Sequence, residues 1–437
     1  MLDPDQGCAG EGGEQSHLER CGAALRRVFG AFEHRNFRIM WAGAFTSATA
    51  RSLQGLAQSW FIYDISRSAY YLGLTSFLEE IPIFAFSVVG GALADRHSRR
   101  KMLGLSQIIQ MCCALTLAVL VLSHLRTMWP ILCLSFVRGC GQALGGPAYA
   151  ALVPRLVPAR IVPNAIALNT TQFSIARAIG PSLGAFVMRR FGAAWCFAIN
   201  GVSYLAPVAS LAALRIEETP SQGPSLLASI GQGLRYLVKN APLRNLLLLV
   251  VFMTIIAYPL SPFLTVFVRE VFHRGPETLA AFEFAVGLGS SSAGPVAAAL
   301  AHRDLRRILP AGVVTLALAL VGFALSPNTA TACAFIFLFG AAQGLSQAMV
   351  TAIAASATPD ENRGRVMSVF NTFIRGGPPI GSLIAGVLIQ RFNAPAVFTA
   401  AGCLLALIGL RFQMRRGKLP AVDNSPELLA FRKSASG

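Results

Sequence analysis

The sequence has few charged residues, and acidic residues are especially scarce. Charged side chains make up 13% of the 437 residues, with 20 Asp and Glu against 37 Lys and Arg. A water-soluble protein is typically about one quarter charged. Hydrophobic residues make up 54% of the chain. They recur in blocks of about 20 residues, and each block is long enough to cross about 30 Å of hydrocarbon. The composition excludes a soluble globular protein and predicts an all-α polytopic membrane protein.

Several patterns that carry chemistry are also missing. The sequence has no HExxH motif, which disfavours a membrane-embedded metalloprotease, and no GxxxxGK[ST] loop, which disfavours an ATP-driven pump. None of the nine cysteines belongs to a CxxC or Cys/His pattern, so we interpret them as small packing residues. We therefore expect no enzyme activity, no metal and no bound cofactor.

The chain has a net charge of +17, but the positions of its positively charged residues disfavour a nucleic-acid partner. The cations lie mainly in short loops between apolar blocks, and most of those loops fall on one side of the predicted bundle. No basic surface interleaved with aromatic residues accompanies them. This bias, with an even number of spans, predicts that both termini lie in the cytoplasm.

The apolar blocks predict about twelve transmembrane helices in two pseudo-symmetric six-helix bundles. The spans are expected near 37–63, 70–93, 102–123, 129–152, 164–188, 194–214, 244–268, 278–300, 308–326, 330–356, 366–390 and 394–414. The corresponding domains are a cytoplasmic polar tail (1–35), an N-terminal bundle (36–214), a cytoplasmic linker with an amphipathic helix (215–243), a C-terminal bundle (244–414) and a cytoplasmic tail (415–437).

The two halves resemble each other in sequence. A shift of 207 positions lays residues 91–100 on residues 298–307, with six identities. A shift of 201 positions lays residues 187–191 on residues 388–392 and Gly180 on Gly381. Two matches in the same order at similar offsets indicate a parallel internal repeat, as in transporters whose halves rock about a central site.

The loop after the second span resembles the G-x-L-x-D-R-x-G-R-R motif of the major facilitator superfamily. The matching residues are Gly91, Leu93, Asp95, Arg96, Arg99 and Arg100, with Ser98 where the motif has glycine. Five further segments resemble the bacterial branch of this superfamily that contains the enterobactin exporter and macrolide-type efflux permeases. They are residues 36–38, 151–154, 163–169, 177–181 and 363–368.

This resemblance implies a transporter of the bacterial inner membrane that exports a small organic molecule by proton antiport. The proton gradient would be its energy source, and the bilayer, protons and cargo would be its partners. A siderophore is the preferred cargo and an antibiotic the alternative, with an outer-membrane export protein as a further expected partner.

The resemblance also implies that Gly91, Asp95, Arg96, Arg99 and Arg100 form a gating latch. Asp95 would sit against the positive N-terminal end of the eleventh helix and hold the cytoplasmic side closed. Plain topogenic charge is the alternative interpretation.

Glu79 and Glu80 are the most unusual charged residues, because they lie midway along the second span. A carboxyl group at membrane depth is costly and normally faces the bundle interior. Adjacent residues lie about 100° apart on a helix, so we expect at most one to point straight into a cavity. We predict that they carry exchangeable protons. The alternative is a structural ion pair with Arg51 or Arg138.

Three more residues are predicted to serve proton or substrate coupling. Arg138 interrupts the fourth span in a segment that resembles the family's R-x-x-x-G-type motif, and Arg51 lies within the first span. Glu283 corresponds to a position one helical turn before Glu80, although a place near the helix end favours a surface position almost equally. Arg177 and Arg375 also fall within spans, where helix ends or interfaces would explain them.

Gly180, Pro181 and Gly184 in the fifth span resemble the family's antiporter motif. Glycine lets helices approach closely, and proline removes a backbone hydrogen bond and allows a kink. Ordinary helix packing is the alternative.

Overall fold

The structure of the chain, a computed structural model, describes residues 29–96, 98–124, 127–214, 226–300, 303–414 and 420. The side chains of residues 86–97, 99, 226–230 and 298 lie outside that description.

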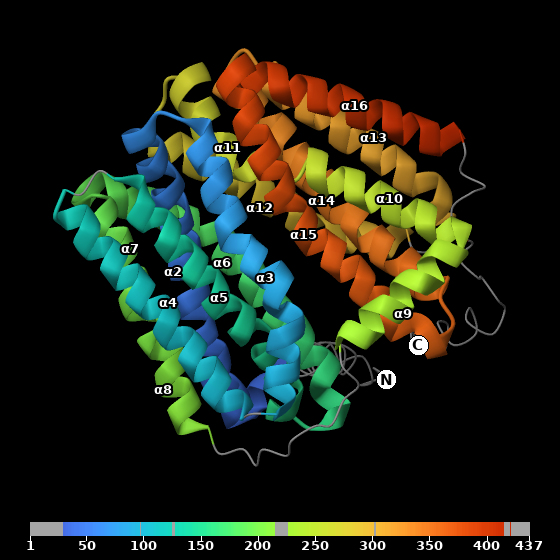
Figure 1. The fold of residues 1–437 in the computed structure, drawn as a ribbon, viewed down its shortest axis with the longest axis horizontal. Coiled ribbons are helices and arrows are strands. Elements are labelled where there is room, and N and C mark those ends of the chain that lie inside the picture. The colour runs from blue at the N-terminus through green and yellow to red at the C-terminus, as the bar shows by residue number, and fades with distance from the viewer. Residues whose placement is uncertain are drawn as a thin grey trace, which may run out of the picture.

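The described chain consists of helices and contains no strand (Figure 1). The first half consists of η1 (Gly30–Glu33), α2 (Arg35–Ser66), α3 (Ala69–Arg96), α4 (Arg99–Leu122), α5 (Met128–Leu152), η2 (Val153–Leu156), η3 (Ala159–Ile161), α6 (Val162–Phe191), α7 (Ala193–Ser203) and α8 (Leu205–Ala213). Helix α9 (Leu226–Lys239) lies between the halves in sequence. The second half consists of α10 (Ala241–Ile256), α11 (Leu260–Val266), the π-helical turn η4 (Phe267–Val271), α12 (Pro276–Leu300), α13 (Leu305–Ala324), α14 (Thr329–Ser356), α15 (Asp360–Phe392) and α16 (Ala394–Met414).

The prediction of an all-α bundle is confirmed, and each predicted span overlaps one helix or one broken helix. Within the first half α2 packs on α6 and α3 on α5, and within the second half α12 packs on α14 and α13 on α16. The most extensive contacts between the halves are those of α3 with α15 and of α6 with α12 (Figure 1).

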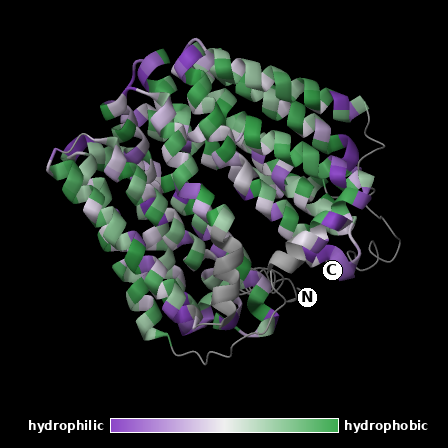
Figure 2. Cartoon of the chain, in the orientation of Figure 1, coloured by the Kyte–Doolittle hydropathy of each residue, from purple (hydrophilic) through white to green (hydrophobic). Residues whose placement is uncertain are grey.

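Large apolar side chains on the outward faces fit a bilayer. Phe186 is 66% exposed and Leu407 is 65% exposed, which a water-soluble surface rarely allows in such numbers. Figure 2 shows hydrophobic residues along the helices and hydrophilic residues near many helix ends.

Among the described residues, seven helical segments are long and apolar enough to cross a membrane alone, or up to eight if one bent pair counts as a single span. Helices α2 and α12 are not among them. Arg51 in α2 and Glu283 in α12 are ionisable side chains that lower the hydropathy of these two helices.

Two predicted spans are broken rather than continuous. The span at 194–214 divides at Tyr204 into α7 and α8, because Pro207 has no N–H to donate to the carbonyl of Ser203. The span at 244–268 divides at residues 257–259, where Pro259 precedes α11. Helix α10 therefore ends at Ile256, before this proline.

We call the end of the bundle formed by the start of α2 and the end of α16 the proximal end, and the opposite end the distal end. Near the distal end α3 and α15 cross with their backbones in contact. A Cβ atom on Gly73 would collide with the carbonyl oxygen of Ser382, and one on Gly386 would lie 3.0 Å from the carbonyl oxygen of Ala69. Small residues permit this approach between halves.

Replacing Gly73 with alanine is expected to destabilise the protein by about 1–3 kcal/mol, because the added methyl group overpacks the α3–α15 crossing. Gly104→Ala is the matched control, since a Cβ atom at Gly104 has no atom within 4 Å and alanine favours a helix over glycine. Thermal unfolding of the purified variants should show a lower Tm for Gly73→Ala alone. Equal Tm values would contradict the close crossing.

Candidate functional site

A cavity of 580 Å³ lies between the two halves. Helices α2, α3, α5 and α6 line it from the first half, and α11, α12, α14 and α15 line it from the second. Its wall combines ionisable side chains with hydroxyl and amide groups such as Gln58, Thr75, Tyr258 and Gln343. Such a mixed wall suits a polar organic molecule.

The structure brings all five residues predicted for coupling to this one cavity: Arg51, Glu79, Glu80, Arg138 and Glu283. Arg177 and Arg375 line it as well. Sequence reasoning had placed these two arginines within spans but assigned them to helix ends or interfaces. The signal that could have found them is the same one that found Arg138, a cation interrupting an apolar span.

Glu79 and Arg138 form an ion pair within the cavity wall. Arg138 is buried, with 8% of its surface exposed. The neighbouring Gly139 makes the pair possible, because a Cβ atom there would collide with the backbone carbonyl oxygen of Glu79. Helices α3 and α5 therefore approach closely at this level, and the pairing considered for Glu79 on sequence grounds is present.

Glu80 is placed differently. It also lines the cavity, so both adjacent residues contribute to the wall. Among the described residues, no cation lies within ion-pair distance of Glu80. Glu79 is therefore paired with Arg138, whereas Glu80 has no such ion pair among the described residues.

Glu283 lies on α12 on the opposite wall. It is half-buried, and the hydroxyl group of Ser261 donates a hydrogen bond of 3.5 Å to its Oε1 atom. The cavity, rather than the protein surface, is its location. Arg51 donates a hydrogen bond of 3.5 Å to Gln142, and its buried Nε atom has no described partner.

The residues of the predicted latch are only partly described. The side chains of Gly91, Asp95, Arg96 and Arg99 lie outside the described residues. Arg100 donates to the backbone carbonyl oxygens of Ala212 and Leu214, at 3.0 and 3.3 Å. This contact ties the start of α4 to the end of α8 within the first half.

Gly180 and Gly184 are buried where α6 crosses α2, and Cβ atoms on them would meet Ser52 and Leu53. Pro181 lies between them and lines the cavity. The segment Gly180–Gly184 also matches GxSxG, the sequence motif around the nucleophilic serine of many hydrolases. That nucleophile requires a sharp strand-to-helix turn, whereas this segment lies inside a helix.

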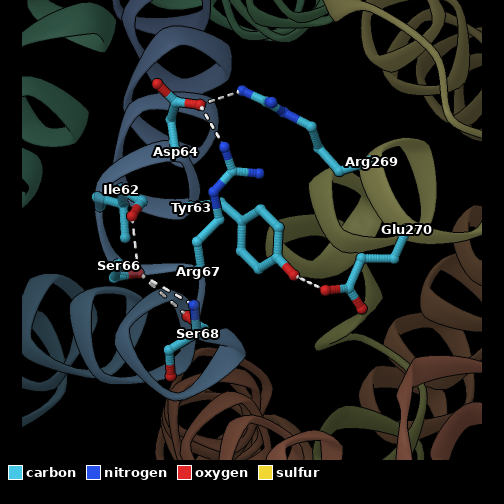
Figure 3. Close-up of polar contacts among 8 residues, drawn as sticks. All are labelled: Ile62, Tyr63, Asp64, Ser66, Arg67, Ser68, Arg269 and Glu270. Carbon is cyan, nitrogen blue, oxygen red and sulfur yellow. Dashed lines mark hydrogen bonds and ion pairs between the residues drawn. The ribbon is translucent and has the colours of Figure 1, made fainter.

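Polar residues also join the halves at the distal end, and this feature was not expected from the sequence (Figure 3). Asp64 on α2 accepts a hydrogen bond of 2.6 Å from Arg269 on η4, and Tyr63 donates to Glu270. Arg269 also lies over the ring of Trp60, 4.1 Å from its centroid. We call Trp60, Tyr63, Asp64, Arg269 and Glu270 the distal polar cluster.

Two further contacts also join the two halves. Thr265 donates to Ser59 at 3.0 Å, and Arg189 lies 3.1 Å from Glu277. In the sequence, charged residues at helix ends such as Arg269 look like residues that only set membrane topology. The turn of η4 in the structure is what shows that Arg269 faces α2. A π-helical turn often accompanies a functional position.

A family model described as transmembrane secretion effector matches residues 27–432. Macrolide efflux protein A of Streptococcus pyogenes is 22% identical over 385 residues, which cover 86% of this chain and 94% of that protein. The enterobactin exporter EntS of Citrobacter koseri is 25% identical over 409 residues, covering 90% of this chain and 96% of that protein.

Solved structures show the same fold at low sequence identity. The nucleoside transporter NupG aligns with a TM-score of 0.73 at 13% identity, covering 88% of this chain and 99% of that chain. A D-xylose–proton symporter aligns with a TM-score of 0.69 at 14% identity, covering 89% of this chain and 98% of that chain.

Proposed function

Since this chain belongs to the transmembrane secretion effector family of the major facilitator superfamily, we propose that it exports a small organic molecule by proton antiport. It is a polytopic membrane transporter, and two of its relatives are an efflux protein and an exporter. The observation that carries the proposal is the cavity between the halves, where Glu80, which has no ion pair with any described residue, lies beside the Glu79–Arg138 pair.

The arrangement supports alternating access. With the distal polar cluster closed, cargo reaches the cavity from the proximal end. Rocking of the halves breaks the contacts of Asp64 and Tyr63 with η4, and the cargo leaves at the distal end. A proton then binds Glu80 or Glu283 from the distal side and neutralises it, which favours return to the original state. The proton leaves on the proximal side.

The proximal side is the cytoplasm in this proposal, and the membrane is the bacterial inner membrane. Asp95, Arg96 and Arg99 would latch the proximal end in the opposite state, as the motif of Gly91–Arg100 implies. Energy comes from the proton gradient, with no bound cofactor.

A siderophore is the preferred cargo. Arg51, Arg177 and Arg375 line the cavity, and no described carboxylate pairs with them within 4 Å. Guanidinium groups complement the anionic oxygens of an iron chelator. The enterobactin exporter among the relatives supports the same class.

An antibiotic is the second candidate. Glu80 and Glu283 could bind a cargo with a basic amine, which would compete directly with protons for the same carboxylates. The relative named as a macrolide efflux protein favours this class.

Deletion of the gene separates these two candidates. Under iron limitation, we expect the deletion strain to secrete less iron chelator and to retain more inside the cell, with recovery on complementation. Mass spectrometry of both fractions measures the effect. Unchanged chelator levels together with raised macrolide sensitivity would contradict the siderophore and support the antibiotic. Any passage of chelator through the outer membrane would use a separate protein partner.

A further inference from the structure

A groove on the surface of the second half lies apart from the central cavity. It has a volume of 670 Å³ and is formed by the start of α10 and the end of α16. Its lining contains two arginines, Arg244 and Arg411, and apolar side chains that include Leu248, Phe252 and Ile408. Leu248 is 44% exposed and Phe252 is 39% exposed, so this face is not covered by another described helix.

The polarity of the groove changes along its length. Arg244, Leu248 and Phe252 are spaced four residues apart, which places them on one face of α10. The arginine lies nearest the proximal end, and the two apolar residues run toward the middle of the membrane. On α16, Ile408 is the deeper residue and Arg411 lies nearer the proximal end. From Arg244 to Phe252 the helix rises about 12 Å, close to the hydrocarbon depth of one leaflet, about 15 Å.

The proximal end of the groove is positively charged. Arg244 and Arg411 are exposed, and no described carboxylate pairs with either of them within 4 Å. One nitrogen of Arg244 donates to the carbonyl oxygen of Val238 at 3.2 Å, which holds the side chain and leaves other N–H groups free to donate. The first turn of α10 adds its positive dipole end to the same place.

We propose that this groove binds a phospholipid with an anionic headgroup. The headgroup phosphate lies between Arg244 and Arg411, because a guanidinium group matches the geometry of phosphate oxygens. One acyl chain lies along Leu248 and Phe252. Basic pockets between transmembrane helices at a membrane surface bind anionic headgroups by this chemistry. The apolar floor distinguishes a lipid from free phosphate, which would bind only at the charged end.

Native mass spectrometry of the purified full chain, with phosphatidylglycerol and phosphatidylcholine as probes, tests the proposal. The unmodified protein is expected to retain phosphatidylglycerol about tenfold more than phosphatidylcholine. Arg244→Gln with Arg411→Gln should make the two lipids equal. Arg160→Gln is the matched control, since Arg160 is an exposed arginine at the same end of the bundle and lies outside the groove.

Equal retention of the two lipids by the unmodified protein would overturn the proposal whether or not the variant folds. A preference that survives in the double variant would also overturn it. Inorganic phosphate at millimolar concentration is the second arm, read out by thermal unfolding. If phosphate stabilises the protein as much as phosphatidylglycerol does, and the double variant loses both effects, the site binds phosphate rather than lipid.

Discussion

Replacing Glu79 and Glu80 together with glutamine is expected to abolish pH-gradient-driven export in inverted vesicles while the protein still inserts into the membrane. Glutamine keeps the size of each side chain but cannot gain or lose a proton at neutral pH. Both residues line the cavity, and no other described carboxylate on its first-half wall could replace them. We expect the remaining export to be below about one tenth of that of the unmodified protein, which corresponds to a loss of more than about 1.4 kcal/mol of coupling.

The two single variants separate the loss of export from the loss of stability. Glu80→Gln removes a carboxyl group without an ion pair, so it should lose export without losing stability. Glu79→Gln leaves the buried Arg138 without its partner, which costs about 3–5 kcal/mol, so this variant should also unfold at a lower temperature. Glu361→Gln is the matched control, because Glu361 is exposed at the start of α15. Full export by the Glu80→Gln variant would remove Glu80 as the proton carrier.

Replacing Arg269 with alanine is expected to shift the protein toward states that are open at the distal end. The change removes the hydrogen-bonded ion pair with Asp64 and the contact with the ring of Trp60, both of which join the two halves. An exposed ion pair contributes about 0–1 kcal/mol and a cation–π contact about 0.5–2 kcal/mol. Together they favour the closed distal end by about 0.5–3 kcal/mol, which is about twofold to 150-fold in population.

Cysteine labelling measures this shift. In a background without native cysteines, Ser76→Cys places one thiol in the cavity wall, and a reagent that cannot cross the membrane labels it from the distal side. Arg269→Ala should increase the labelling rate, and Arg269→Lys should preserve much of the closure.

Arg67→Ala is the matched control, because Arg67 lies 3.6 Å from the same Asp64 but on the same half of the protein. Equal labelling of the Arg269→Ala and Arg67→Ala variants would show that the distal polar cluster does not hold the halves together.

The helices could be predicted from the sequence because hydropathy fixes where a chain crosses a bilayer. The breaks at Tyr204 and at residues 257–259 were less accessible. Proline marks a place where a helix can break, but packing decides whether it kinks or divides. Pro82 remains inside the continuous helix α3, whereas Pro207 and Pro259 lie at divided helices.

The charged lining of the cavity could also be predicted from the sequence, because an ionisable group within an apolar span normally faces the interior of the bundle. Which residues form ion pairs with one another could not be predicted. Glu79 and Glu80 are adjacent in sequence, and only the crossing of α3 and α5 at Gly139 assigns Arg138 to Glu79. The distal polar cluster joins residues about 200 positions apart at helix ends, where charges are common in any membrane protein.

Proton movement coupled to cargo movement is the most direct test of the proposed antiport. In proteoliposomes with a pH-sensitive dye inside, addition of cargo should raise the internal pH, because each entering molecule is exchanged for protons that leave. The Glu79→Gln/Glu80→Gln variant should show no such rise. Cargo uptake at an unchanged internal pH, insensitive to a protonophore, would contradict proton antiport.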